Sequence, residues 1–252
     1  MTNLLSIITP CYRPDPKYLE EAYQSILQQQ IPQTWDWEWV IQEDGYTEEA
    51  ENILPEDPRI KIANGRHSGV ALTRNLALAR SRGALIKNLD ADDMLAPEVL
   101  QRDIDTLASN PLIQWTTSRV LDLLPDGTTL SFGNDPPAGS LPPGFVMDHW
   151  VGHNYRLPVH PTTICIRRPL VIALGGWMAV PGSDDTGLLT AASVISTGYF
   201  HQEVGLFYRK WAGQETAQTA HVDPTELQLR ISLIRERAQY LSEFWPQAQV
   251  PS

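Results

Sequence analysis

The sequence predicts an α/β protein whose central sheet is mostly parallel and is flanked by helices. Over the first 110 residues, short apolar runs of the length of buried strands alternate with longer segments in which apolar residues recur at helical spacing. The predicted order is strand, helix, strand, strand, helix, strand, helix. Such an alternation is typical of a parallel sheet with helices on its faces.

Four apolar runs supply the predicted strands of this half. The first is residues 3–9, and Pro10 and Pro14 prevent it from continuing. Three more runs of similar length follow, and each is short enough to be a buried strand rather than a helix. They are residues 37–42, 59–64 and 84–89.

Three segments of the same half are predicted to be helices, at residues 17–30, 69–83 and 96–110. Gly83 lies where a glycine commonly ends a helix, and Pro97 lies in the first turn, where proline is tolerated. Each segment aligns apolar residues on one face. These are Leu19, Ala22, Tyr23 and Ile26 in the first, Leu72, Leu76 and Ala79 in the second, and Leu100, Ile104 and Leu107 in the third.

The second half is less regular. Residues 134–148 hold four prolines and two glycines, which predicts a loop that could act as a lid. A strand at 162–167, a helix near 186–197, a strand near 204–209 and a final helix are expected after it. In the final helix, Asp223 and Glu226 resemble a capping box with Pro224 between them. The predicted buried stripe is Leu227, Ile231, Ile234, Ala238 and Leu241.

Composition excludes some classes of function. The 252-residue chain carries a formal net charge of −11, which argues against a nucleic-acid binder and against adhesion to an anionic membrane. Two cysteines do not make a disulfide framework, and they favour a reducing cytoplasm. The N-terminal segment lacks the basic region of a signal peptide, and no apolar run is long enough to span a membrane. We therefore expect a soluble cytoplasmic protein without a transmembrane segment.

The segment LIKNLDADDML, residues 85–95, places three aspartates at the end of a predicted buried strand. Ligands of open parallel sheets bind beyond the carboxyl ends of the strands, where Asp90, Asp92 and Asp93 are expected to lie. A bound Mg²⁺ or Mn²⁺ would offset their mutual repulsion and would bridge them to an anionic substrate. The alternative is that Asp92 or Asp93 caps the helix at 96–110.

The order of several segments resembles the family 2 glycosyltransferases, which have the GT-A fold. The segments are SIITPCYRP (6–14), QEDG (42–45), GVALTRNLALARSRGALIKNLDADD (69–93), GGW (175–177) and YRKWAGQ (208–214). The resemblance implies a Rossmann-like, nucleotide-sugar-binding half in residues 1–110. It implies that residues 111–215 form the acceptor-binding and catalytic half of the same domain, followed by a C-terminal helical segment in 216–252.

The same resemblance implies a donor site for a nucleoside-diphosphate sugar, most simply a UDP-sugar. It assigns the metal to Asp92 and Asp90. An ordinary Asp-Gly turn is the alternative for Asp44, and a solvated helix face is the alternative for Arg74. The implied donor-binding residues are Thr9, Pro10, Tyr12, Arg13, Asp44, Arg74, Asp90, Ala91 and Asp92.

Transfer also needs a base that takes the proton of the attacking acceptor hydroxyl. Family members usually carry Glu-Asp before a helix in the second half, and here Asp184 and Asp185 match that pair. The resemblance implies Asp185 as the base, Asp184 as the second choice, and inversion at the anomeric carbon. Capping of the following helix is the alternative role for both.

On the acceptor side, His160 and Trp177 are candidates for contact with sugar or acceptor, although packing would explain either of them. Trp211 stands where the family often has a histidine, which helps to bind the metal in some members. An indole cannot ligate a cation but could stack on a sugar or a base. Gln214 and Arg209 could reach the diphosphate, or could be structural.

Two other readings of the sequence remain open. A nucleotidyltransferase can share such a sheet and such acids, although TPCYRPDPK is not the glycine-rich loop that it would typically use. A catalytically inactive nucleotide-binding or scaffold protein would explain Trp211, although it has little need for the clustered acids. The acceptor is not specified, and a soluble small molecule is expected.

Overall fold

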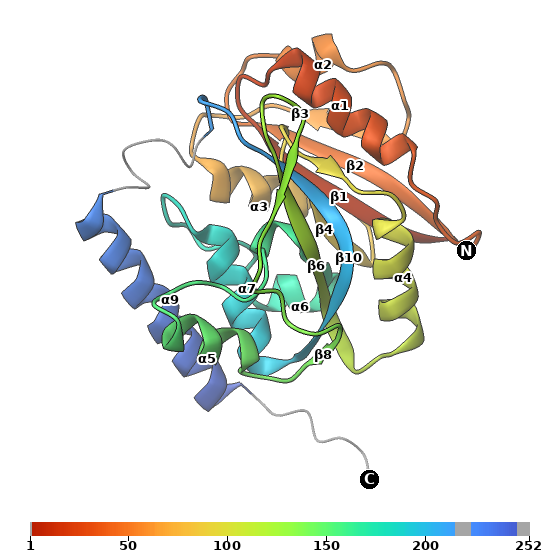
Figure 1. Cartoon of the computed structure of the whole chain (residues 1–252). Helices are drawn as coiled ribbons and strands as arrows, with labels where there is room; N and C mark the ends of the chain where they lie inside the picture. Colours follow the sequence, from red (N-terminus) through yellow and green to blue (C-terminus); the bar gives the residue numbers. More distant parts are fainter. Residues whose placement is uncertain (1, 215–222, 246–252) are drawn as a thin grey trace.

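The computed structural model describes residues 2–214 and 223–245, and within them a single mixed sheet of ten strands forms the centre of the fold (Figure 1). The strand order is β3-β2-β1-β4-β9-β6-β10-β5, with β7 beside β6 and β8 beside β10. The strands are β1 (Asn3–Cys11), β2 (Trp35–Glu43), β3 (Ile60–Ala63), β4 (Leu85–Asn88), β5 (Met94–Leu95), β6 (Ile113–Leu123), β7 (Thr129–Ser131), β8 (Gly139–Leu141), β9 (Cys165–Arg167) and β10 (Thr197–Arg209).

Strands β3, β2, β1 and β4 pair in parallel with their neighbours in that order, as do β6 and β10. The short strands β5, β7, β8 and β9 pair antiparallel with their neighbours, so the longer strands are the ones paired in parallel. The sheet is therefore mostly parallel, as the sequence predicted. The helical segments are α1 (Pro16–Leu27), α2 (Glu49–Ile53), α3 (Val70–Arg80), α4 (Val99–Ser109), α5 (Phe145–Gly152), η1 (Pro161–Thr163), α6 (Arg168–Ala173), α7 (Asp184–Ile195) and α9 (Pro224–Phe244).

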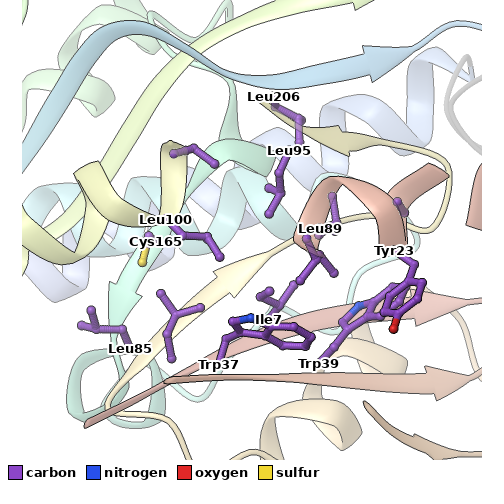
Figure 2. Close-up of a cluster of buried hydrophobic side chains, with 14 of the residues drawn as sticks. Ile7, Tyr23, Trp37, Trp39, Leu85, Leu89, Leu95, Leu100, Cys165 and Leu206 are labelled. Atoms are coloured by element: carbon purple, nitrogen blue, oxygen red, sulfur yellow. The ribbon is translucent and has the colours of Figure 1, made fainter. Parts of the chain in front are cut away.

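Helices cover both faces of the sheet, because alternate strand residues face opposite ways. Ile7 packs with α1, α2 and α4 in one core cluster, and the adjacent Ile8 packs with α3, α5, α6 and α7 in the other. Figure 2 shows part of the first cluster, where Tyr23 of α1 lies over Trp39 with ring centroids 6.0 Å apart. Figure 1 shows the same division, with α1, α2 and α4 on one side of the strands and α3, α6 and α7 on the other.

The buried face of α3 differs from the predicted one. Leu72 and Leu76 are 44% and 40% exposed, and the buried residues are instead Ala71, Thr73, Arg74, Ala77 and Leu78. The buried side carries Arg74, which forms a buried ion pair with Asp184 and a partly buried one with Asp90. The spacing of the leucines alone therefore indicated the wrong side of the helix. By contrast, the predicted buried residues of α1 and α4 are all buried.

Gly83 does not end α3. The helix ends at Arg80, and a side chain at position 83 would lie 2.4 Å from the backbone nitrogen of Ser6 in β1. The glycine therefore allows the chain to pass close to β1 before it enters β4.

The second half contains more regular structure than the sequence predicted. The eleven-residue strand β6 was not predicted at all, and β10 begins at Thr197 rather than near 204. Residues 134–148, expected to be a loop, include β8 and the start of α5. Only residues 165–167 of the strand expected at 162–167 are a strand, because the 3₁₀-helix η1 precedes them.

A charged pair is buried between strand β4 and helix α4. The Lys87 ammonium lies 2.8 Å from an Asp103 carboxylate oxygen, and the two side chains are 1% and 0% exposed. The hydroxyl of Thr116 donates a hydrogen bond to the other Asp103 oxygen, and Lys87 also donates one to the carbonyl of Thr163. Because every charge here has a partner, the pair joins β4, α4, β6 and η1 in one polar network.

The final helix α9 begins as predicted, because the Asp223 carboxylate accepts hydrogen bonds from the backbone amides of Thr225 and Glu226. Ile231, Ile234 and Ala238 are buried, and Leu241 is partly buried, but Leu227 is 36% exposed. The rest of the segment predicted at 216–252 lies partly outside the described residues. Among the residues that the structure describes, no helix has the length and apolar character needed to cross a membrane.

Candidate active site

The candidate site lies where parallel strands end. Asp90 follows β4, Asp44 follows β2, and the Pro10 region ends β1, which pairs in parallel with both of those strands. Their carboxyl ends therefore meet at one edge of the sheet, where open α/β sheets bind ligands.

The three aspartates of the 90–93 segment do not act alike. Asp93 is fully buried, and one of its oxygens accepts a 2.8 Å hydrogen bond from the backbone amide of Arg209. Burial, followed by repulsion from Asp92 and Asp90, raises the pKa of Asp93 well above its usual value. Asp93 thus joins the segment to β10, whereas Asp90 and Asp92 are only partly buried.

The alternative in which Asp92 or Asp93 caps α4 is wrong. That helix begins at Val99 after Glu98, and β5 lies between the aspartates and the helix. The carboxylates must therefore be explained by another role.

Arg74 connects the two groups of acids. Its guanidinium donates 2.6 Å hydrogen bonds to Asp90 and to Asp184, and its side chain is 6% exposed. Burial alone would lower the pKa of Arg74, but Asp184, Asp90 and Asp185 together raise it, so the guanidinium stays charged. The alternative that Arg74 lies on a solvated helix face is therefore wrong, because its side chain lies at the centre of the site.

Asp184 and Asp185 form the first turn of α7, after Ser183, whose φ of 62° is left-handed. Asp184 is buried against Arg74, and an oxygen of Asp185 accepts a 2.6 Å hydrogen bond from the backbone amide of Thr186. Burial and repulsion from Asp184 raise the pKa of Asp185 to about 6, although Arg74 opposes the shift. A carboxylate with such a pKa suits general-base chemistry near neutral pH.

Trp211 contacts the acidic segment directly. Its indole Nε1 donates a 2.7 Å hydrogen bond to Asp92 Oδ2, and its ring meets Tyr18 edge-on at 5.5 Å. A side chain at Gly213 would collide with the ring, at 2.1 Å. Burial raises the pKa of Asp92 in spite of the hydrogen bond from Trp211.

Arg209 holds the neighbouring backbone in place. It donates to the carbonyl of Asp92, lies 2.5 Å from the Glu21 carboxylate, and has its guanidinium 4.0 Å from the centre of the Tyr18 ring. The side chain of Gln214 donates to the carbonyl of Arg209. Both residues are used inside the protein here, and contact with a diphosphate stays a prediction.

The Asp44 carboxylate holds the loop before α3. Its two oxygens accept hydrogen bonds of 2.6 Å from the backbone amide of Ser68 and 3.0 Å from that of Gly69. His67, which lies 3.0 Å from the same carboxylate, stacks on the half-exposed Tyr12 ring at 4.6 Å. His67 was not among the residues predicted from the sequence to lie at the site. The signal that could have found it is its place between the predicted strand at 59–64 and the predicted helix at 69–83.

The remaining candidates on β1 lie on either side of its end. Thr9 is fully buried, and its hydroxyl donates to the carbonyl of Leu89 and accepts from the indole of Trp39. Pro10 is partly buried, whereas Tyr12 and Arg13 are exposed, and Arg13 has a positive φ of 45°. Ala91 is partly buried between Asp90 and Asp92.

The acceptor-side candidates His160 and Trp177 have different surroundings. His160 lies beside Tyr208, with ring centroids 4.8 Å apart, and burial lowers its pKa to about 4. Its Nδ1 has no partner within the described part of the chain. Trp177 is 2% exposed in the second core cluster, and its backbone exchanges two hydrogen bonds with the Asn75 side chain. Trp177 therefore has a core role in this structure.

Asp90 and Asp92 suit a divalent cation that takes its remaining ligands from water and substrate. Across residues 2–214 and 223–245, no group of three His, Cys, Asp or Glu side chains is arranged to hold a metal ion. Mg²⁺, however, commonly takes one or two carboxylates and completes its shell with water and substrate phosphates. Burial, with a smaller contribution from repulsion by Asp90, raises the pKa of Asp92, and a bound cation would offset that repulsion.

Comparison with solved structures supports the fold. The structure of residues 1–349 of S. aureus TarS in complex with UDP-GlcNAc superposes with a TM-score of 0.69 at 18% identity, over 98% of this chain and 72% of that one. A complex of the same TarS segment with UDP gives a TM-score of 0.61 at 17% identity, over 97% of this chain and 73% of that one. At this level of identity the similarity establishes the GT-A-like fold alone.

Sequence comparison identifies relatives among glycosyltransferases. TuaG of Bacillus subtilis, named as a glycosyltransferase of teichuronic acid biosynthesis, is 34% identical over 113 residues, which are 42% of this chain and 43% of TuaG. Chondroitin synthase of Escherichia coli is 31% identical over 140 residues, or 53% of this chain and 20% of the synthase. The aligned segments span less than half of either relative. The family model described as "Glycosyl transferase family 2" matches residues 6–167, well over half of the chain, and the chain therefore belongs to glycosyl transferase family 2.

Proposed function

We propose that the protein transfers a sugar from a nucleoside-diphosphate sugar to an acceptor hydroxyl or amine, with inversion at the anomeric carbon and with help from Mg²⁺ or Mn²⁺. One observation carries the proposal. Arg74 contacts Asp90 on the donor side and Asp184 on the base side, each at 2.6 Å. The Arg74 guanidinium thus holds one acid from each half of the chain, and Asp185 lies next to Asp184.

The chain's own residues have separate roles in this reaction. Asp185 accepts the proton of the attacking hydroxyl as the acceptor oxygen bonds to the anomeric carbon. The bond from that carbon to the diphosphate oxygen breaks, and the diphosphate leaves with the electron pair. A single displacement from the face opposite the leaving group inverts the anomeric centre, and the raised pKa of Asp185 suits the proton transfer.

Donor binding is assigned to the edge of the sheet. Tyr12, stacked on His67, offers a ring face to a nucleotide base, and Asp44 holds the same loop through Ser68. Pro10 and Arg13, which are close to Tyr12 in the sequence, complete the assigned set. Asp92 and Asp90 would hold the cation, which would supply positive charge to the diphosphate. A UDP-sugar is the donor we favour, because TarS, which shares the fold, has been solved with UDP-GlcNAc and with UDP.

Asp92→Asn is expected to abolish metal-dependent donor binding. The change removes a negative charge from the proposed cation site while it keeps the size of the side chain. Calorimetric titration of UDP with and without Mn²⁺ measures the effect, and the expected loss in affinity is about tenfold or more. The matched control is Asp126→Asn, an exposed aspartate in the turn between β6 and β7. Equal Mn²⁺-dependent UDP affinity in the two variants would refute the assignment.

The reaction itself is tested by incubating the protein with UDP-sugars and following UDP release, with and without candidate acceptors. Slow, Mn²⁺-stimulated hydrolysis of a donor supports the proposal. Release of pyrophosphate from a nucleoside triphosphate would instead indicate a nucleotidyltransferase. UDP binding without turnover of any donor would indicate an inactive nucleotide-binding protein.

Trp211→His is expected to raise the affinity for Mn²⁺. In the wild type the indole donates a hydrogen bond to Asp92 Oδ2. An indole cannot ligate a cation, whereas an imidazole can. Free Mn²⁺ measured by electron paramagnetic resonance reports binding without any need for turnover. Trp211→Phe is the control, because it removes the hydrogen bond but adds no ligand. If histidine gives no tighter binding than phenylalanine, Trp211 does not lie at a cation site.

A further inference from the structure

A cavity of about 320 Å³ lies beside the Asp184–Asp185 pair, between the end of α5, the start of α7 and the start of α9. Its wall is largely apolar and includes the side chains of Trp150, Tyr155, Leu157, Leu227 and Ile231. Its volume is within the range of small-molecule sites, in which apolar walls are combined with a few polar groups.

The polar part of the lining leads to Asp185. Ser183 and Thr186 border the cavity, and they flank the Asp184–Asp185 pair in the sequence. The backbone amide of Thr186 donates a 2.6 Å hydrogen bond to Asp185 Oδ1, and its hydroxyl lies 3.5 Å from the same oxygen. A molecule in the cavity would therefore lie one side chain away from the proposed base.

The loop after α5 is shaped to present an aromatic wall. Asn154 and Tyr155 have positive φ angles of 52° and 62°, which residues other than glycine rarely adopt. The Tyr155 ring meets the Trp150 ring edge-on, with centroids 5.1 Å apart, and Arg235 donates to the Tyr155 hydroxyl. Such strain persists where the surroundings enforce it, and it is concentrated at functional sites.

We infer that this cavity is an acceptor subsite that takes an apolar, ring-sized group attached to the sugar or alcohol that is glycosylated. The inference rests on the proposed function and adds the class of acceptor. A larger cavity of about 520 Å³ between α5 and α9 is a weaker candidate, because its lining includes the charged Asp148, Arg235 and Glu236 and it does not include the residues beside Asp185.

The test compares two β-D-glucopyranosides that share the sugar and differ in the aglycone, which is an aromatic ring in one and a methyl group in the other. Calorimetry measures the affinity of the protein for 4-nitrophenyl β-D-glucopyranoside and for methyl β-D-glucopyranoside. We expect the aryl glycoside to bind at least about tenfold more tightly, because only its ring can enter the cavity. Equal affinity for the two probes, or no measurable binding of the aryl glycoside, would overturn the inference.

Variants on α9 locate the binding. Leu227 lines the cavity and is 36% exposed, so Leu227→Trp fills the space with little strain and is expected to weaken aryl binding by about tenfold. Leu229 is 66% exposed and is not part of the lining, so Leu229→Trp is the matched control and should change binding less than about twofold. Equal weakening by both variants, or by neither, would contradict the subsite.

UDP affinity is measured on the same samples. Unchanged UDP affinity in Leu227→Trp shows that the variant is folded and that its loss concerns the cavity alone. Aryl binding without any UDP binding would uphold the cavity and refute the proposed function. UDP binding with equal affinity for the two glycosides would refute the cavity and leave the proposed function standing.

Discussion

Arg74→Met is expected to lower the free energy of unfolding by about 3–5 kcal/mol, because it removes one partner of a buried ionic group. The guanidinium is 6% exposed and satisfies Asp90 and Asp184, which in the variant would keep their negative charges without a cation. The two uncompensated carboxylates would then repel each other, which destabilises the folded state. Urea denaturation at pH 7 measures the change.

The matched control for this variant is Arg82→Met. Arg82 also faces a carboxylate, at 3.7 Å from Glu38, but its side chain is 72% exposed. Exposed pairs contribute about 1 kcal/mol or less, so the control should remain close to the wild type. The double variant Arg74→Met with Asp184→Asn should recover part of the loss, since one uncompensated charge is removed. Equal stability of the Arg74 and Arg82 variants would show that the pairs of Arg74 do not hold the site together.

Asp185→Asn is expected to lower the rate of sugar transfer by a factor of about 10²–10⁴ while UDP affinity stays close to that of the wild type. The amide cannot take the proton of the attacking hydroxyl, but it has nearly the same shape. Single-turnover transfer with saturating donor isolates this step from binding. A transfer rate equal to that of the wild type would rule out Asp185 as the base.

The pH dependence of the wild type follows from the same residue. Burial raises the pKa of Asp185 to about 6, and a base must be deprotonated, so kcat/KM should fall as the pH decreases below about 6. Asp184 contributes to the raised pKa by repulsion, and Arg74 opposes it. In Asp184→Asn the acidic limb should therefore move to lower pH, whereas a limb that belongs to substrate ionisation would stay in place.

The sequence predicted the first half of the fold well because its strands and helices depend on apolar runs. It failed at β6, whose buried residues include Thr116, Thr117 and Ser118. A strand that buries polar side chains against partners such as Asp103 carries no hydrophobic pattern that reveals it. The face of α3 was mistaken for a related reason, since ion pairs rather than leucines decide which side of that helix is buried.

The site was predictable in its composition but not in its contacts. Both acidic pairs and Arg74 were named from sequence, and the structure brings Asp90, Arg74 and Asp184 together. Nothing local indicates that the Trp211 indole bonds to Asp92, because 119 positions separate them. The different role of Asp93 also required the fold, since its partner is the backbone amide of Arg209 in β10.

The Lys87–Asp103 pair restricts how this chain can diverge. A mutation at either position alone would leave an unpaired charge in the interior, which costs about 3–5 kcal/mol. The free energy of unfolding of a domain is typically only about 5–15 kcal/mol. Changing both residues to apolar ones would avoid that cost, but a lineage reaches the double change only through an intermediate close to unfolding. Descendants of this protein should therefore keep both residues or replace both, and a homologue with only one of them would need a new partner nearby.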